Sequence, residues 1–231
     1  MVTVRPATPV RRALASAAVA LALVLPGAAA AAAEDAARGR ELFQLCAACH
    51  GAAGEGSRLH RAPVIAGLPR AYVEAQLVKF KEGVRGFAPA DAEGLRMRPM
   101  ARALGRPGDV AAVSAWVAGL LPPAPPRTAA GDAARGKAAY AACVACHGQR
   151  AGGNEALGAP PLARQADWYL AAQLDKFRRG LRGTHPGDVG GAQMRPIALA
   201  LPDERAIADL VTYIGALAAD RSVAAAPGGS R

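Results

Sequence analysis

The stretch Cys46-Ala-Ala-Cys-His50 contains the residues that decide the fold of this 231-residue chain. The same pattern returns as Cys143-Val-Ala-Cys-His147. A Cys-x-x-Cys-His sequence is the attachment motif of a c-type haem. The two thiols add across the vinyl groups of the haem, and the adjacent histidine supplies an imidazole ligand to the iron. Two copies of the motif therefore predict two covalently bound haem c groups in one polypeptide.

Disulfides, zinc and thiol redox chemistry are the alternative uses of these cysteines. All 4 cysteines of the chain lie in the two haem motifs, so none remains for a disulfide. A zinc site is disfavoured because 93 residues separate Cys49 from Cys143, which is far from the usual spacing of two ligand pairs. A thioredoxin-like pair explains neither the histidine that follows each motif nor the duplication.

The chain is an internal duplication in which matching positions are 97 residues apart. Cys46 falls on Cys143 and His50 falls on His147 without a gap. Further matches are Gly39 with Gly136, Pro63 with Pro160, Tyr72 with Tyr169, Gln76 with Gln173, Lys79 with Lys176, Phe80 with Phe177, Arg85 with Arg182, Met97 with Met194 and Trp116 with Tyr213. A repeat of this length is a whole domain rather than a short solenoid element.

Composition divides the chain into five segments. Residues 1–33 combine a basic start, an apolar core and small residues. They predict a secretory signal peptide cleaved near residue 33, with an uncleaved membrane anchor as the alternative. Residues 34–121 and 132–219 are predicted to form two haem domains, here called unit one and unit two. Residues 122–131 are a proline-rich linker, and residues 220–231 are expected to form a flexible tail.

Hydrophobic periodicity predicts an all-α fold without strands. In unit one, a helix over residues 35–45 leads into the haem motif, a second runs from Pro69 to Gly83, and a last one begins at Pro107 and Asp109. The apolar stripe of the last helix is Val113, Trp116, Val117 and Leu120 in unit one, and Ile207, Leu210, Val211, Ile214 and Leu217 in unit two. A loop rich in glycine, proline and arginine is expected to carry Met97, and its repeat Met194.

The second axial ligand of each iron is predicted to be a methionine. Met97 and Met194 coincide under the repeat, and a thioether is a soft donor suited to low-spin iron. The remaining histidines, His60 and His185, do not coincide, so surface or haem-edge positions are expected for them. Met100 has no methionine counterpart and is assigned to packing. The alternative is that all three methionines fill the core.

The predicted iron ligands are therefore His50 with Met97, and His147 with Met194. Each histidine must donate its second ring N–H to an acceptor, and the carbonyls of Pro63 and Pro160 are candidates. Two repeat-related sets are expected to contact haem propionates or to line the contact between the units. These sets are Tyr72, Gln76 and Arg85 in unit one, and Tyr169, Gln173 and Arg182 in unit two.

The formal net charge of the chain is +10, and it falls to +7 when the three arginines of residues 1–33 are left out. A basic protein can bind nucleic acid or an anionic membrane. No cluster of basic and aromatic residues supports nucleic-acid binding. The excess is instead expected to neutralise propionates and to favour docking to an acidic redox partner.

Both units resemble class I c-type cytochromes, and the tandem arrangement resembles the dihaem cytochrome c4 family. The similarity lies in the haem motif, in Pro63-x-Ile-Ala-Gly67, in the segment from Tyr72 to Arg85, and in Met97-x-Pro-Met100. It implies two all-α haem domains about a pseudo-twofold axis, with His/Met ligation at both irons. It also implies a periplasmic, often membrane-associated protein of the respiratory chain. The proline-rich linker and Arg164-Gln165 depart from the family pattern.

The resemblance implies an electron carrier rather than an enzyme, working from a quinol-oxidising complex toward a haem–copper oxidase. Dihaem peroxidases and thiosulfate-oxidising cytochromes share the paired motifs but need an open iron or an unusual ligand. With both methionines present and no spare cysteine, direct catalysis is disfavoured. The alternative is the dihaem electron-transfer subunit of a flavin-containing sulfide dehydrogenase, whose flavin would lie on another polypeptide.

Overall fold

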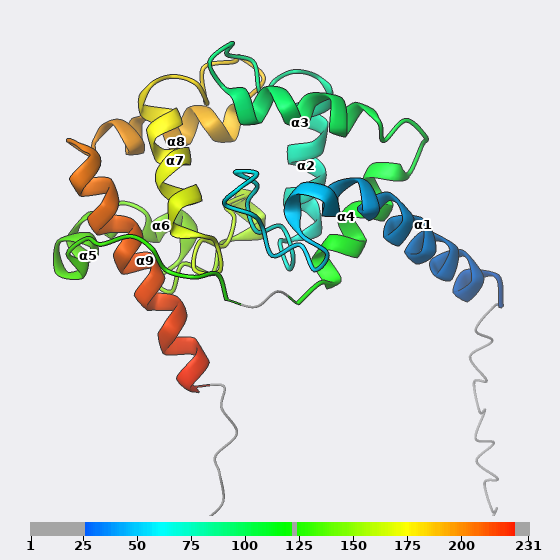
Figure 1. Ribbon diagram of the computed structural model, residues 1–231, viewed down its shortest axis with the longest axis horizontal. Helices are drawn as coiled ribbons and strands as arrows, with labels where there is room; N and C mark the ends of the chain where they lie inside the picture. Colours follow the sequence, from blue (N-terminus) through cyan, green and yellow to red (C-terminus); the bar gives the residue numbers. More distant parts are fainter. Residues whose placement is uncertain (1–25, 122–123, 225–231) are drawn as a thin grey trace, which may run out of the picture.

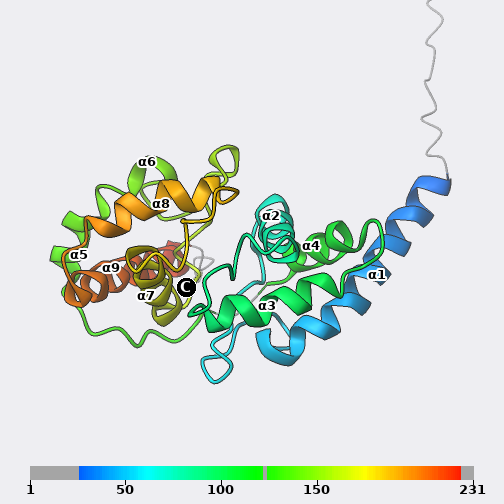
Figure 2. The ribbon, with the colours of Figure 1, turned by 90° about the horizontal axis from the view of Figure 1, so that it is seen from above.

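The computed structural model describes the backbone of residues 26–121 and 124–224, and Figures 1 and 2 show two helical units side by side. Most of the predicted signal peptide lies outside the described residues. Unit one contains α1 (Pro26–His50), α2 (Arg70–Lys81), α3 (Ala92–Arg102) and α4 (Asp109–Gly119). Unit two contains α5 (Ala133–Tyr140), α6 (Val144–His147), the 3-10 helix η1 (Glu155–Leu157), α7 (Asp167–Arg178), α8 (Val189–Leu199) and α9 (Glu204–Ala224).

Strands are absent from the described part of the chain, as the sequence predicts, so the fold is all-α. Two isolated β-bridges pair Ser57 with Ala62 and Asn154 with Ala159, and they close equivalent turns of the two units. The helix predicted after Pro69 is confirmed as α2, with Pro69 at its N-cap and Gly83 at a φ of 79° just beyond its end.

The core of each unit forms where its first and last helices cross, α1 with α4 and α5 with α9. A Cβ atom added at Gly39 would lie 2.4 Å from the Ala112 carbonyl oxygen. A Cβ atom added at Gly136 would lie 2.0 Å from the Asp209 carbonyl oxygen. Only glycine allows backbones this close. The predicted stripes are confirmed, with these buried residues in the two cores: Leu42, Phe43, Leu104, Val113 and Val117; and Tyr140, Leu170, Ile207, Leu210, Val211 and Ile214.

Three boundary predictions are wrong. Met97 and Met194 lie on α3 and α8 rather than in loops, although Pro99 and Pro196 lie within these helices. The N-cap hydrogen bonds at the first turns of α3 and α8 favour helix formation more than the nearby proline and glycine residues oppose it. Helix α1 begins at Pro26 and continues through the haem motif, so it is longer than the helix predicted over residues 35–45. Helix α9 extends to Ala224, beyond residue 219, where unit two was predicted to end.

The described part of the linker is attached to unit two. Arg127 donates hydrogen bonds to the carbonyl oxygens of Ala163 at 2.7 Å and Gln165 at 2.9 Å. The Thr128 hydroxyl donates to the Asp167 carboxylate at 3.0 Å. These contacts make residues 127–128 an extension of unit two rather than a free spacer.

Candidate haem sites and the interface between the units

The haem motif of unit one occupies the last turn of α1. The side chain of His50 is buried, and its Nδ1 atom lies 2.9 Å from the Pro63 carbonyl oxygen. A carbonyl only accepts, so Nδ1 carries the proton and donates, which leaves the Nε2 lone pair available to a metal. The predicted role of Pro63 is confirmed.

The haem motif of unit two has the same geometry on a shorter helix. His147 is buried at the end of α6, and its Nδ1 lies 2.9 Å from the Pro160 carbonyl oxygen. Here a turn separates α5 from α6, whereas α1 is continuous through the equivalent residues. The hydrogen bond between the histidine and its carbonyl acceptor is therefore the same in both units, although the backbone that leads to the motif differs.

Burial sets the protonation of the motif side chains. It lowers the pKa of His50 and of His147, although the proline carbonyls oppose this, so the neutral imidazole that binds metal is favoured. Burial raises the pKa of the Cys46 thiol to about 11, and burial with the nearby Cys146 raises that of Cys143 to about 11. Cys46, Cys49, Cys143 and Cys146 are all free of disulfides.

Zinc binding finds no support in the arrangement of ligating side chains. Within residues 26–121 and 124–224, no group of three or more His, Cys, Asp or Glu side chains is close enough to hold a metal ion. The two Cys-x-x-Cys pairs therefore do not meet in a shared site.

The predicted methionine ligands occupy matching positions on α3 and α8 and are half-buried. In Figure 1 these two helices lie along the upper side of the molecule, while the haem motifs at the end of α1 and on α6 lie below them. This placement suits ligands that approach a haem from opposite faces. Met100 is 38% exposed, so its side chain is only partly covered, and its packing role stays a prediction.

Buried arginine atoms provide a test of whether haem fits these units. The Nε atoms of Arg85, Arg98, Arg182 and Arg195 are buried and lack a hydrogen-bond partner. They form two repeat-related pairs, 85 with 182 and 98 with 195. Burial and the positive charge of Arg85 lower the pKa of Arg182. Buried guanidinium N–H groups without a partner favour an acceptor at these positions, and the carboxylates of haem propionates would fit.

The predicted propionate or interface residues lie at the contact between the units. Arg85 donates to Gln76 at 2.9 Å, and Arg182 donates to Gln173 at 2.7 Å. Each guanidinium also lies 4.4 Å from the centre of a phenylalanine ring of its own unit. Across the contact, Tyr72 interacts with Arg182, and Tyr169 interacts with Arg85.

Other contacts between the units were not foreseen from the sequence. Gln165 exchanges two hydrogen bonds with the backbone of Val64, at 3.0 and 2.9 Å. The rings of Phe87 and His185 meet edge to face at 4.9 Å, where the loops before α3 and α8 meet in Figure 1. His185 is thus an interface residue, whereas His60 is exposed. The departure from the family pattern at Arg164-Gln165 lies in Arg164, so it gave no signal for Gln165.

Two lysines also form ion pairs across the contact between the units. Lys79 of α2 pairs with Asp188 before α8, and Lys176 of α7 pairs with Asp91 before α3. All four residues match under the repeat, Lys79 with Lys176 and Asp91 with Asp188. We call them the crossed pairs. The repeat aligned the lysines, but it could not reveal that each bonds to the opposite unit.

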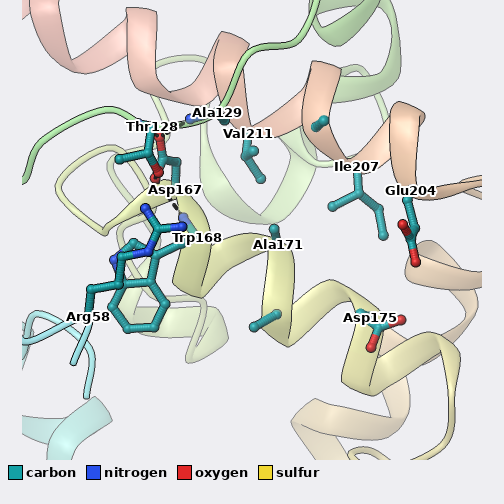
Figure 3. Close-up of a pocket in the computed structure, with 12 residues that line it drawn as sticks. Arg58, Thr128, Ala129, Asp167, Trp168, Ala171, Asp175, Glu204, Ile207 and Val211 are labelled. Carbon is teal, nitrogen blue, oxygen red and sulfur yellow. Dashed lines mark hydrogen bonds between the residues drawn. The ribbon is translucent and has the colours of Figure 1, made fainter. Parts of the chain in front are cut away.

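A separate hollow of about 370 Å³ lies on unit two between the linker, α7 and α9. Figure 3 shows Arg58 of unit one beside the Trp168 ring at its edge. Its polar lining includes Asp167, Asp175 and Glu204, and it contains none of the predicted haem-binding residues.

Comparison with known proteins agrees with this geometry. The sequence profile of the family described as cytochrome c matches twice, over residues 36–121 and 133–218. The chain belongs to the cytochrome c family. Its two domains place it with the dihaem cytochrome c4-like proteins, and they imply two covalently bound haem c groups and a role as an electron carrier.

Curated relatives of this cytochrome include two kinds of electron-transfer protein. It is 35% identical to the "Thiosulfate dehydrogenase electron acceptor" of Stutzerimonas stutzeri, over 74% of this chain and 79% of the relative. It is 33% identical to "Cytochrome c4" of Azotobacter vinelandii, over 80% of this chain and 90% of the relative.

Solved structures give the same relationship. The cytochrome matches reduced cytochrome c4 from Pseudomonas stutzeri with a TM-score of 0.62 and 27% identity, over 78% of this chain and 96% of that one. It matches thiosulfate dehydrogenase (TsdBA) from Marichromatium purpuratum with a TM-score of 0.63 and 34% identity. That match covers 77% of this chain but spans only 39% of the Marichromatium chain.

Within the described ranges, no helix is both long enough and apolar enough to cross a membrane. The uncleaved anchor, which is the alternative to a cleaved signal peptide, would begin in residues 1–25, outside those ranges.

Proposed function

We propose that this dihaem cytochrome is a periplasmic electron carrier that takes electrons from a quinol-oxidising complex and delivers them to a haem–copper terminal oxidase. The observation that carries the proposal is the pair of equivalent sites, each with a fixed histidine and a repeat-related methionine. His50 and Met97 would hold one iron, and His147 and Met194 the other. Because the chain would supply two ligands to each iron, neither iron would be open to a substrate, which supports carriage rather than catalysis.

The residues of the chain have distinct tasks in this function. When bound, each haem supplies an iron that alternates between two oxidation states. The carbonyls of Pro63 and Pro160 orient the imidazoles. The unpaired Nε atoms of Arg85 and Arg182 supply positive charge for propionates. The contact between the units holds the two haem sites next to each other in one structure.

A second candidate is that the cytochrome accepts electrons from a thiosulfate dehydrogenase. The supporting observation is its 35% identity to the electron acceptor of Stutzerimonas stutzeri and 34% identity to that of Thiomonas intermedia. In that role the chain remains a carrier, and only its donor differs. A subunit of a flavin-containing sulfide dehydrogenase would be recognised by copurification of a flavoprotein.

The donor is tested by stopped-flow reduction of the oxidised holoprotein. We expect rapid reduction by a quinol-oxidising complex with quinol, followed by reoxidation on adding a haem–copper oxidase. Rapid reduction by thiosulfate dehydrogenase with thiosulfate alone would instead select the second candidate. Failure with both donors would contradict the carrier roles proposed here.

Association with the native donor should depend on ionic strength. Because the chain is basic, with a net charge of +10 that falls to +7 without residues 1–33, we expect an acidic partner to be attracted over a distance. Raising salt from low to high should slow second-order reduction by about tenfold or more. Reduction by a small uncharged reductant is the control and should not change. A donor rate that is independent of salt would contradict this docking mode.

A further inference from the structure

We infer that Lys79 and Lys176 are positioning residues, each of which holds the methionine-bearing helix of the opposite unit. Lys79 Nζ lies 2.7 Å from Asp188 Oδ1, and Lys176 pairs with Asp91. Figure 2 places α2 and α3 in one unit and α7 and α8 in the other, so both pairs cross the contact. The part of the inference that concerns the irons rests on the proposed ligands Met97 and Met194.

Both aspartates are the N-caps of the helices concerned. The Asp91 carboxylate accepts a hydrogen bond from the Gly94 amide at 3.1 Å, and that of Asp188 accepts from the Gly191 amide at 3.2 Å. A side chain at Gly94 would place its Cβ 2.1 Å from an Asp91 oxygen, which shows how closely the cap fits the first turn. The carboxylate thus fixes where the helix begins, and the methionine lies on the same helix.

Burial makes these caps depend on the lysines. The side chains of Asp91 and Asp188 are each only 2% exposed. A buried carboxylate without a cation is strongly disfavoured, so removing the lysine either displaces the cap or protonates it. Although burial alone would raise the pKa of Asp188, Lys79, Arg182 and the Gly191 amide hold it below its ordinary value. A lysine of one unit therefore controls the first turn of α3 or α8 in the other.

The two crossed pairs differ in strength. Lys176 also lies 2.6 Å from Glu93 Oε2, and Arg61 contacts the same carboxylate. Burial opposes ionisation of Glu93, but Lys176 and Arg61 lower its pKa to about 2. Its counterpart is Gly190, where an added Cβ would lie 3.9 Å from Lys79 Nζ. At the start of α3, two carboxylates therefore pair with one buried lysine, whereas at the start of α8 only one carboxylate pairs with a lysine.

The test replaces each lysine and follows both units of the holoprotein by NMR. Lys176→Met keeps the apolar stem and removes the charge, and it should speed exchange of the Gly94 amide about tenfold. It should also shift the ring-current-shifted methyl resonance of Met97 in the reduced protein. Lys79→Met should act likewise on Gly191 and Met194. Lys137→Met, at an exposed site on α5, is the control for loss of one positive charge.

Conservative and additive variants separate positioning from general stabilisation. Lys176→Arg keeps a cation and should restore slow exchange at Gly94. Gly190→Glu offers Lys79 a second carboxylate and should slow exchange at Gly191 about threefold relative to Gly190→Gln, which has a similar shape without the charge. These variants and Lys79→Met, whose lysine is 22% exposed, carry the test if Lys176→Met does not fold.

Changes confined to the opposite unit support the inference. Exchange that rises equally in both units, or only in the unit that carries the substitution, overturns it, as does unchanged exchange at Gly94 and Gly191. Failure of the ligand assignment gives a different result. In that case the native protein lacks ring-current-shifted methyl resonances for Met97 and Met194. Faster amide exchange in the unit opposite each substituted lysine would still show that the lysine positions the helix of that unit.

Discussion

Replacing Met97 or Met194 with alanine is expected to lower the reduction potential of one haem and leave the other near its native value. Loss of the thioether removes the ligand that stabilises reduced iron and opens that position to water or small molecules. We expect a fall that is a substantial part of the roughly 0.8 V range that axial ligands span. A spectroelectrochemical titration of each variant measures both potentials.

Met100→Ala provides a matched control for the methionine variants. Met100 lies on the same helix as Met97 but is 38% exposed and matches Ile197 in unit two. Its replacement should leave both potentials close to the native values. Unmoved potentials in Met97→Ala and Met194→Ala, or an equal fall in Met100→Ala, would contradict the ligand assignment.

Replacing both Cys143 and Cys146 with serine is expected to leave one covalent haem per chain and to unfold unit two. The buried core cluster described for this unit is mainly aliphatic, with Tyr140 as an aromatic member, and aromatic residues make up only 4% of the chain. A haem adds a large apolar surface that a domain of under about 100 residues otherwise lacks. Mass spectrometry and absorbance count the haems, and hydrogen exchange reports the loss of structure.

The reciprocal variant Cys46→Ser with Cys49→Ser is the matched comparison. It should also retain one haem, now in unit two, with loss of protection concentrated in α1 and α4. Two haems retained covalently in either double variant would show that these cysteines are not the attachment sites. Full protection of the haem-free unit would show that its core does not depend on the cofactor.

Most of the haem chemistry is predictable from the sequence because it is local or repeated. The Cys-x-x-Cys-His motifs are contiguous, and Pro63 follows His50 by 13 positions, just as Pro160 follows His147. The carbonyl acceptors could therefore be named in advance. Apolar stripes at helical spacing likewise located α2, α4, α7 and α9.

Features that depend on competing local signals or on long-range contacts were harder to predict. Glycine and proline near Met97 and Met194 suggested loops, but the caps formed by Asp91 and Asp188 outweigh Pro99 and Pro196 and produce helices. The crossed pairs join residues 109 and 85 positions apart. A repeat aligns equivalent residues but does not say whether they pair within a unit or between units.

The central claim is that each iron lies between an imidazole nitrogen and a thioether sulfur. An optical potentiometric titration of the purified native protein, with carbon monoxide added at the reduced end, tests it most directly. We expect two haems per chain, a sulfur-to-iron charge-transfer band in the oxidised spectrum, and no prompt binding of carbon monoxide after reduction. Absence of that band, or rapid carbon monoxide binding, would contradict the claim.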